Sequence, residues 1–184
     1  MLEITIHSGE RFDEETRTFI SLKKDVKITL EHSLISISRW ESIYKRPYLS
    51  DRGPRTGEEI LDYIRCMTIT QNVDPNAYYF LSESDLHKIN EYLGNEQTAT
   101  TFHSHVQDRR RKKGETPSSE LIYYWMFSMG IPKDCERWHI SRLLTLIRVF
   151  DVKQSKPKKR SKKQMIAERN ALNKARRAQY NTTG

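Results

Sequence analysis

His103 and His105 form the pattern in this sequence that most resembles a metal site. Alternate side chains of a β-strand point to the same side, so the two imidazoles of an H-x-H pair can bind one metal ion. A catalytic zinc ion needs a third protein ligand, but the residues after this pair are mostly Arg, Lys, Gly and Glu. Asp108 and Glu115 follow the pair and could act as ligands, but no motif fixes their positions. We therefore expect two surface histidines and no bound metal ion or cofactor.

Cys135 and His139 are four residues apart, which is about one turn of a helix. Catalytic Cys and His side chains normally come from separate elements, so we interpret His139, beside Trp138, as a partly buried packing histidine. The chain also has no G-x-x-x-x-G-K-[ST] or G-x-G-x-x-G motif for binding a nucleotide, and only seven glycines. The sequence therefore predicts a protein that is not an enzyme.

The charge of the chain changes abruptly near residue 152. Residues 153–184 carry eleven Lys and Arg and one acidic residue, Glu168, which gives this segment a net charge of +10. The whole chain has a net charge of +8, so residues 1–152 are close to neutral at −2. We predict a helical body over residues 1–152 and a basic tail over residues 153–184 that is partly helical or disordered.

The basic tail is the predicted partner-binding region. A run of Lys and Arg can neutralise nucleic-acid phosphates, but the tail has one aromatic residue, Tyr180, and no platform for stacking bases. We therefore place nucleic acid second to a protein partner. The candidate partner-binding residues are Lys158, Lys159, Arg160, Lys162, Lys163, Arg176 and Arg177.

Cysteine content and hydropathy indicate the compartment. Two cysteines are too few for a disulfide scaffold, which favours a reducing, cytosolic setting. The longest fully apolar run, residues 121–127, is much shorter than a membrane-spanning helix. We expect a protein of the cytoplasm with no membrane partner.

The first half of the body shows strand and helix signals. Residues 2–7 and 26–30 alternate apolar and polar side chains, which predicts two short strands that pair antiparallel. A helix is expected from Ser33 until Pro47. Capping-box spacings predict two more helix starts, at residues 56–59 and 82–85, the first with Ile60, Ile64 and Met67 on its buried face.

The second half of the body contains two apolar helices. The first is expected to begin at Thr116 and Pro117, and its apolar residues occur nearly all round the helix, which predicts a central helix covered by its neighbours. The second carries the stripe Ile140, Leu143, Ile147 and Phe150. Residues 130–132 are expected to join them as a helical hairpin. The predicted fold class is mainly α, with a minor N-terminal β element and a basic helical tail.

Several short segments resemble those of the tail assembly chaperones, or closely related morphogenesis proteins, of long-tailed bacteriophages. These segments are LEHS (30–33), SRWES (38–42), IYYW (122–125), IP (131–132), Cys135, WH (138–139), RLLTLI (142–147), RNALNKARR (169–177) and TG (183–184).

The resemblance implies a small, mainly helical protein that works in the host cytoplasm. It would bind the long, aggregation-prone tape-measure protein and keep it soluble while tube subunits assemble around it. Such a protein has no catalytic residues to transfer to this chain. A virion structural protein of the neck or connector, and a nucleic-acid-binding protein acting through the basic tail, are the alternatives. The oligomeric state is left open.

Overall fold

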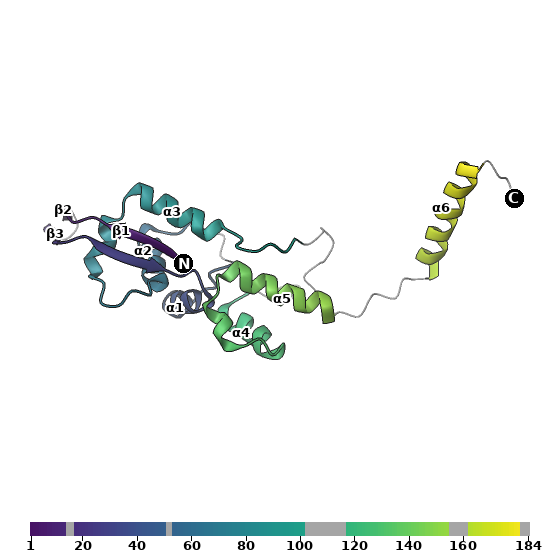
Figure 1. Cartoon of the computed structure of the whole chain (residues 1–184). Helices are drawn as coiled ribbons and strands as arrows, with labels where there is room; N and C mark the ends of the chain where they lie inside the picture. The colour runs from purple at the N-terminus through teal and green to yellow at the C-terminus, as the bar shows by residue number, and fades with distance from the viewer. Residues whose placement is uncertain (14–16, 51–52, 102–116, 155–161, 181–184) are drawn as a thin grey trace. The chain divides into compact units, whose positions relative to one another are not determined.

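The computed structural model describes residues 1–13, 17–50, 53–101, 117–154 and 162–180 (Figure 1). The chain divides into two units, Met1–Val152 and Lys153–Gly184. The first unit contains two small antiparallel strand pairs followed by helices, and the second contains one helix, α6 (Lys162–Tyr180). The predicted class, mainly helical with a minor N-terminal β element, is confirmed. None of the helices in the described part is both long and apolar enough to cross a membrane.

The two predicted strands pair antiparallel as expected. β1 (Leu2–Ile6) lies against β4 (Val26–Leu30), with Leu2 opposite Leu30 and Ile6 opposite Val26. One face of this pair is buried and supplies Ile4, Ile6, Ile28 and Leu30 to the core. This one-sided burial explains the alternating pattern of the sequence. The other edge of β4 is also paired, because the N–H of Ile69 donates to the carbonyl of Thr29 at 2.9 Å.

A second strand pair, which we did not predict, extends the β1–β4 pair into a long β-ribbon. β2 (Gly9–Asp13) pairs with β3 (Thr18–Leu22). Two residues separate β1 from β2, whereas three separate β3 from β4. The extra residue interrupts the ladder in the manner of a β-bulge, and Asp25 closes the gap by accepting the N–H of Ser8 at 2.8 Å. The ribbon therefore has an inner half, β1 and β4, in the core and an outer half, β2 and β3.

The predicted helix starts in the first half of the chain are confirmed. α1 (Leu34–Tyr44) begins after Ser33, whose side chain accepts the N–H of Ser36. α2 (Gly57–Met67) and α3 (Glu83–Gly94) each begin with a capping box, in which two side chains and two backbone N–H groups bond reciprocally. Between them, η1 (Pro75–Phe80) is a short 3₁₀ helix.

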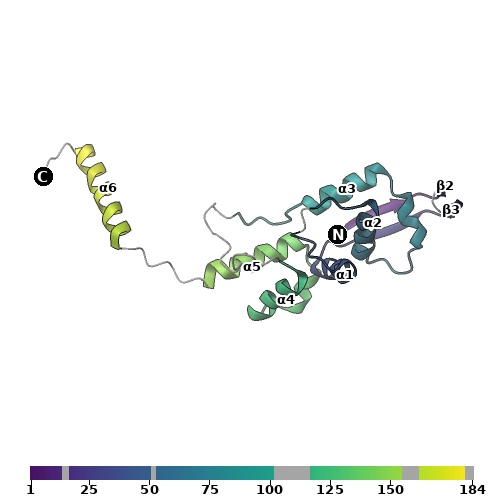
Figure 2. The same cartoon turned by 180° about the vertical axis from the view of Figure 1, so that it is seen from behind.

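Packing of these helices places α1 near the centre of the first unit. It lies against α2, α4 and η2, while α3 and η1 lie against β1 (Figure 2). On α2, Ile64 and Met67 are buried as expected, but Ile60 is 44% exposed, so its assignment to the buried face is wrong. The buried side of α2 is completed by Tyr63 and Cys66 instead.

The first apolar helix of the second half differs from the prediction in two respects. α4 (Ser119–Ser128) has Ser118 as its N-cap, so Pro117 precedes the cap, and Thr116 lies outside the described residues. Its neighbours cover one side only. Ile122, Trp125 and Met126 are buried, whereas Tyr124 and Phe127 are 66% and 60% exposed. The prediction of a helix covered all round is therefore wrong.

The connection to the next helix is also longer than the predicted hairpin. The short helix η2 (Lys133–Arg137) and residues 138–139 lie between α4 and α5 (Ile140–Gln154). The start of α5 is fixed to the segment between β4 and α1, because the N–H of Ile140 donates to the carbonyl of His32 at 2.9 Å. The predicted stripe of α5 is present, with Leu143 and Ile147 buried.

A buried carboxylate joins α1 to the first turn of α4. Glu41 is 6% exposed, and its Oε1 accepts the backbone N–H of Tyr48 at 2.7 Å. Its Oε2 accepts the backbone N–H of Ser119, also at 2.7 Å. The first N–H groups of a helix have no partner within the helix and carry its positive dipole end, so a carboxylate is a favourable acceptor there. Glu41 thus links two segments that are 78 residues apart.

Removal of this carboxylate is expected to destabilise the first unit strongly. Glu41→Ala leaves two buried N–H groups without an acceptor, at about 1 to 3 kcal/mol each, so we expect a loss of about 2 to 6 kcal/mol. Glu41→Gln keeps one acceptor oxygen and should fall between Ala and the wild type. Urea unfolding monitored by tryptophan fluorescence measures both. Glu91→Ala, at an exposed site, is the control, and a Glu41→Ala protein as stable as this control would contradict the assignment.

Candidate functional site

The structure describes part of the predicted site. His103, His105, Lys158, Lys159 and Arg160 lie outside the described residues. Lys162 and Lys163 begin α6, and Arg176 and Arg177 are exposed near its end. Within the described ranges, no group of three or more His, Cys, Asp or Glu side chains is placed to hold a metal ion.

A pair of buried histidines lies at the junction of β4, α3 and α5. The rings of His32 and His139 are edge to face, with centroids 5.0 Å apart. The Nδ1 atom of His32 is 2.5 Å from the hydroxyl of Tyr63, and its backbone N–H donates to the hydroxyl of Tyr92 at 3.3 Å. Burial, with repulsion from His139, lowers the pKa of His32 to about 3. Both histidines are therefore neutral near pH 7, since burial also lowers the pKa of His139.

The hydrogen bonds of His139 connect two helices of the fold. Its Nε2 is 3.2 Å from the carbonyl oxygen of Tyr92, and its Nδ1 is 2.7 Å from the hydroxyl of Ser141. The Ser141 hydroxyl also lies 2.6 Å from the carbonyl oxygen of Glu96. These contacts tie the start of α5 to the end of α3, which confirms the interpretation of His139 as a packing histidine. Cys135 belongs to η2, so the two residues do not share a helix.

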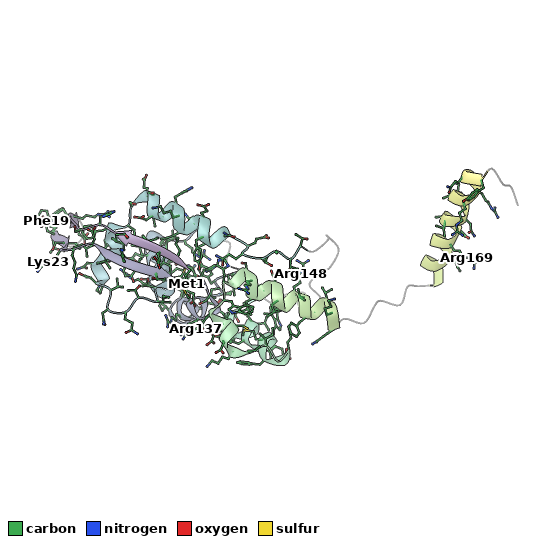
Figure 3. All side chains as sticks on the ribbon, in the orientation of Figure 1. Met1, Phe19, Lys23, Arg137, Arg148 and Arg169 are labelled. Carbon is green, nitrogen blue, oxygen red and sulfur yellow. The ribbon has the colours of Figure 1, made fainter. Side chains whose placement is uncertain are left out.

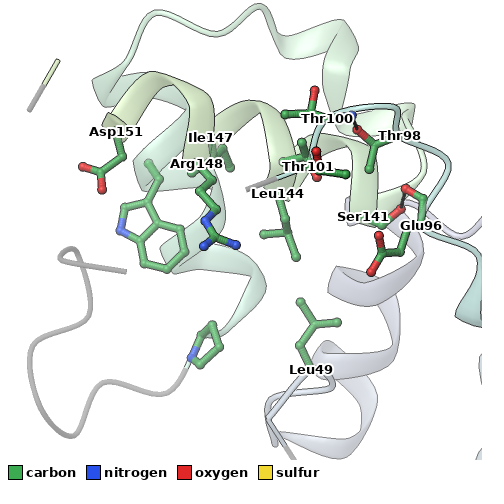
Figure 4. A pocket seen from close by; sticks show the side chains of 13 residues that line it. Leu49, Glu96, Thr98, Thr100, Thr101, Ser141, Leu144, Ile147, Arg148 and Asp151 are labelled. Carbon is green, nitrogen blue, oxygen red and sulfur yellow. Dashed lines mark hydrogen bonds between the residues drawn. The ribbon is translucent and has the colours of Figure 1, made fainter. Parts of the chain in front are cut away.

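A pocket of about 640 Å³ with both polar and apolar walls lies beside this junction, between α5 and the segment at residues 96–101 (Figure 4). Leu144 and Ile147 form part of its apolar wall, and Thr98, Thr100 and Arg148 form part of its polar wall. The described lining contains no His or Cys. Its Ser141 hydroxyl is bonded to His139 and to the carbonyl of Glu96.

The exposed side of α4 is the candidate interaction site. Tyr123 and Tyr124 lie four and three positions before Phe127, so the three side chains are neighbours on the helix surface. We call them the α4 aromatic face. The rings of Tyr123 and Phe127 stack with centroids 6.1 Å apart and planes inclined by 17°. The Tyr123 hydroxyl donates to Glu136 at 2.9 Å, and burial together with this carboxylate raises the pKa of Tyr123. The hydrogen bond to Glu136 therefore holds Tyr123 in place, while Tyr124 and Phe127 remain exposed.

A second exposed aromatic pair lies on the outer half of the β-ribbon. Phe12 and Phe19 are directly opposite in the register of β2 and β3, and their ring centroids are 5.0 Å apart. They are 46% and 74% exposed (Figure 3, where Phe19 is labelled). Directly opposite residues share one face of a strand pair, so both rings project to the solvent side, away from buried Leu22.

Comparisons with models of protein families, with curated proteins and with solved structures find no match to this chain. Its function is therefore argued from its own residues. The α4 aromatic face was missed at the sequence level because apolar residues all round a helix indicate burial without showing which side is covered. Only the structure shows which rings are exposed, because it places Ile122, Trp125 and Met126 on the buried side of the helix.

The buried histidines predict a loss of stability in mild acid. His32 is neutral in the folded protein until about pH 3, whereas in the unfolded chain its pKa is the ordinary 6.5. Between these values the unfolded chain binds more protons, so stability falls as the pH is lowered, by at most about 1.4 kcal/mol per pH unit for each histidine. Urea unfolding at pH 7, 6 and 5 measures the slope.

Two variants separate this effect from general acid sensitivity. His32→Gln should flatten the dependence between pH 7 and 5, whatever its effect on stability at pH 7. His87→Gln, at an exposed position on α3, should keep the wild-type slope. Equal slopes for wild type and His32→Gln would contradict the role of the buried pair.

Proposed function

We propose that this protein binds an apolar helical client and keeps it soluble during assembly, and that the client is the tape-measure protein of a long-tailed bacteriophage. The single observation that carries the binding function is the α4 aromatic face, with Tyr124 66% and Phe127 60% exposed on a helix whose other side is core. The resemblance of the sequence segments to phage tail assembly chaperones supplies the identity of the client.

The α4 aromatic face suits transient binding. Aromatic side chains bury a large area for few rotatable bonds, and burying one fully contributes about 1.5 to 3 kcal/mol. The rings are preorganised, because Tyr123 is bonded to Glu136 and the helix start is bonded to Glu41. Preorganisation reduces the entropy lost on binding, so a small face can capture a client without a large interface.

The surroundings of the face indicate the chemistry of the client. Glu120 is exposed one turn before Tyr124, and Glu136 lies against Tyr123. A client helix that places an apolar stripe on the rings and Lys or Arg beside the stripe would meet both carboxylates. This pattern is typical of amphipathic helices in long helical proteins.

Co-expression with the tape-measure protein tests the proposal. The wild-type protein should raise the soluble fraction of the client severalfold. Tyr124→Ser combined with Phe127→Ser should abolish most of that gain, because the change removes the exposed apolar area while leaving Ile122 and Met126 in the core. The soluble fraction is measured by gel densitometry after centrifugation.

A matched control uses the other exposed aromatic pair. Phe12→Ser combined with Phe19→Ser removes two rings of similar exposure and should retain the activity. Thermal melts establish that both double variants are folded. If the wild-type protein leaves client solubility unchanged, the proposed function is wrong. If the two double variants lose activity equally, the contact is not on α4.

A further inference from the structure

The basic helix α6 has a charge and exposure that the client-binding function does not use. Its nineteen residues include six Lys and Arg and one Glu, a net charge of +5. Every α6 side chain that the structure describes is exposed, including Arg169, which Figure 3 labels. Most of the stability of a helix in a protein comes from packing of an apolar face, and α6 is poor in apolar residues, so it has the composition of a segment that is completed by a partner.

Two opposite faces of α6 carry different kinds of side chain. Arg169, Asn173, Arg176 and Tyr180 follow at spacings of four, three and four, so they lie on one side of the helix. We call these residues the α6 arginine face. The opposite side carries alanines at positions 167, 171 and 175, also at helical spacing. One side therefore carries long side chains that donate hydrogen bonds, and the other carries the short side chains of alanine.

The apolar residues of α6 are few. Met165 and Leu172, seven positions apart, lie on the same side of the helix, and Ile166 lies about 120° round the axis from Leu172. Docking into an apolar protein groove needs a longer series of anchors on one side, at spacings of three, four and seven. Binding to a membrane surface needs a continuous apolar face. Two apolar residues on one side of a nineteen-residue helix with a net charge of +5 favour a partner that is recognised by charge and polar contacts.

We propose that α6 binds double-stranded DNA by lying in its major groove with the arginine face toward the bases. An α-helix with its side chains is about 10 to 12 Å wide, and the major groove of B-form DNA is about 12 Å wide. Arg and Asn are the side chains that pair with the groove edges of guanine and adenine. Arg169 and Arg176 are about 10 Å apart along the axis, since each residue rises about 1.5 Å.

The flanks of the arginine face supply contacts to the phosphates. Arg177 and Lys174 lie successively farther round the helix from Arg176, both exposed, so they are placed to approach one wall of the groove. Double-stranded RNA is a poorer fit, since its major groove is too deep and narrow for side chains to read. This inference goes beyond the proposed function and does not depend on it.

The salt dependence of binding tests the proposal with the full-length protein. The probe is a fluorescein-labelled 20-base-pair DNA duplex, and its anisotropy is followed at 50 to 200 mM NaCl. Binding should weaken steeply with salt. Combining Arg169→Gln, Arg176→Gln and Arg177→Gln should weaken binding at least about tenfold, because two base contacts are lost. The slope of log K against log salt should also become shallower by at least about 0.9, the share of Arg177 at the phosphates.

A charge-matched control and a helix-breaking variant make the test specific. Lys23→Gln, Lys24→Gln and Lys27→Gln remove three exposed cations from the first unit and should leave the slope unchanged. Ala171→Pro breaks α6 without altering its charge and should weaken binding at least severalfold. Circular dichroism and thermal melts of the first unit establish that each variant is folded.

The following outcomes overturn the proposal: no binding of the duplex at 50 mM NaCl, equal slopes for the two triple variants, or wild-type affinity for Ala171→Pro. Tighter binding to a 20-base single-stranded RNA, to an RNA duplex, to polyglutamate or to vesicles of phosphatidylserine and phosphatidylcholine also overturns it, since each assigns α6 to another partner. The client-solubility assay with the arginine variant should be unchanged, so failure here is distinct from failure of the client-binding function.

Discussion

The carboxylate of Glu41 is the constraint on which the arrangement of the first unit depends. α1 packs against α2, α4 and η2, and Glu41 fixes α4 to it by accepting an N–H from the first turn of that helix. A buried carboxylate is costly unless its hydrogen bonds are satisfied, and here both oxygens accept backbone donors. The rotation of α4 about its axis is therefore set by a polar contact as well as by apolar packing.

That rotation decides which residues of α4 meet solvent. With Ser119 held at Glu41, the side that carries Ile122 and Met126 faces the core, and the side that carries Tyr124 and Phe127 faces out. The buried histidines restrain the neighbouring helix in a similar way, since His139 ties the start of α5 to the end of α3. Polar contacts at helix ends thus position the elements, and apolar contacts fill the space between them.

Local signals in the sequence were sufficient to place helix starts and the first strand pair. Thr56 and Glu59 are three residues apart, and the bonds that they make lie within one turn, so the capping box is visible without a structure. Contacts across long separations left no such signal. Nothing near Glu41 indicates a partner 78 residues away, and β2, with Phe12 as its one large apolar residue, lacks the alternation of a half-buried strand. The orientation of α4 and the outer half of the ribbon were missed for these reasons.

The hydrogen bond from Ile140 to His32 has a consequence for the order in which the nascent chain folds. The two residues are 108 positions apart, so the segment after β4 lacks this partner until the start of α5 has been synthesised. At about 5 to 20 residues per second, a ribosome needs about 5 to 20 seconds to add that length. During that interval α2, η1 and α3 can already pack on the ribbon and α1, but the side that α5 covers has no partner. The first unit is therefore completed late in translation, and that side of its N-terminal core is exposed to other chains until then.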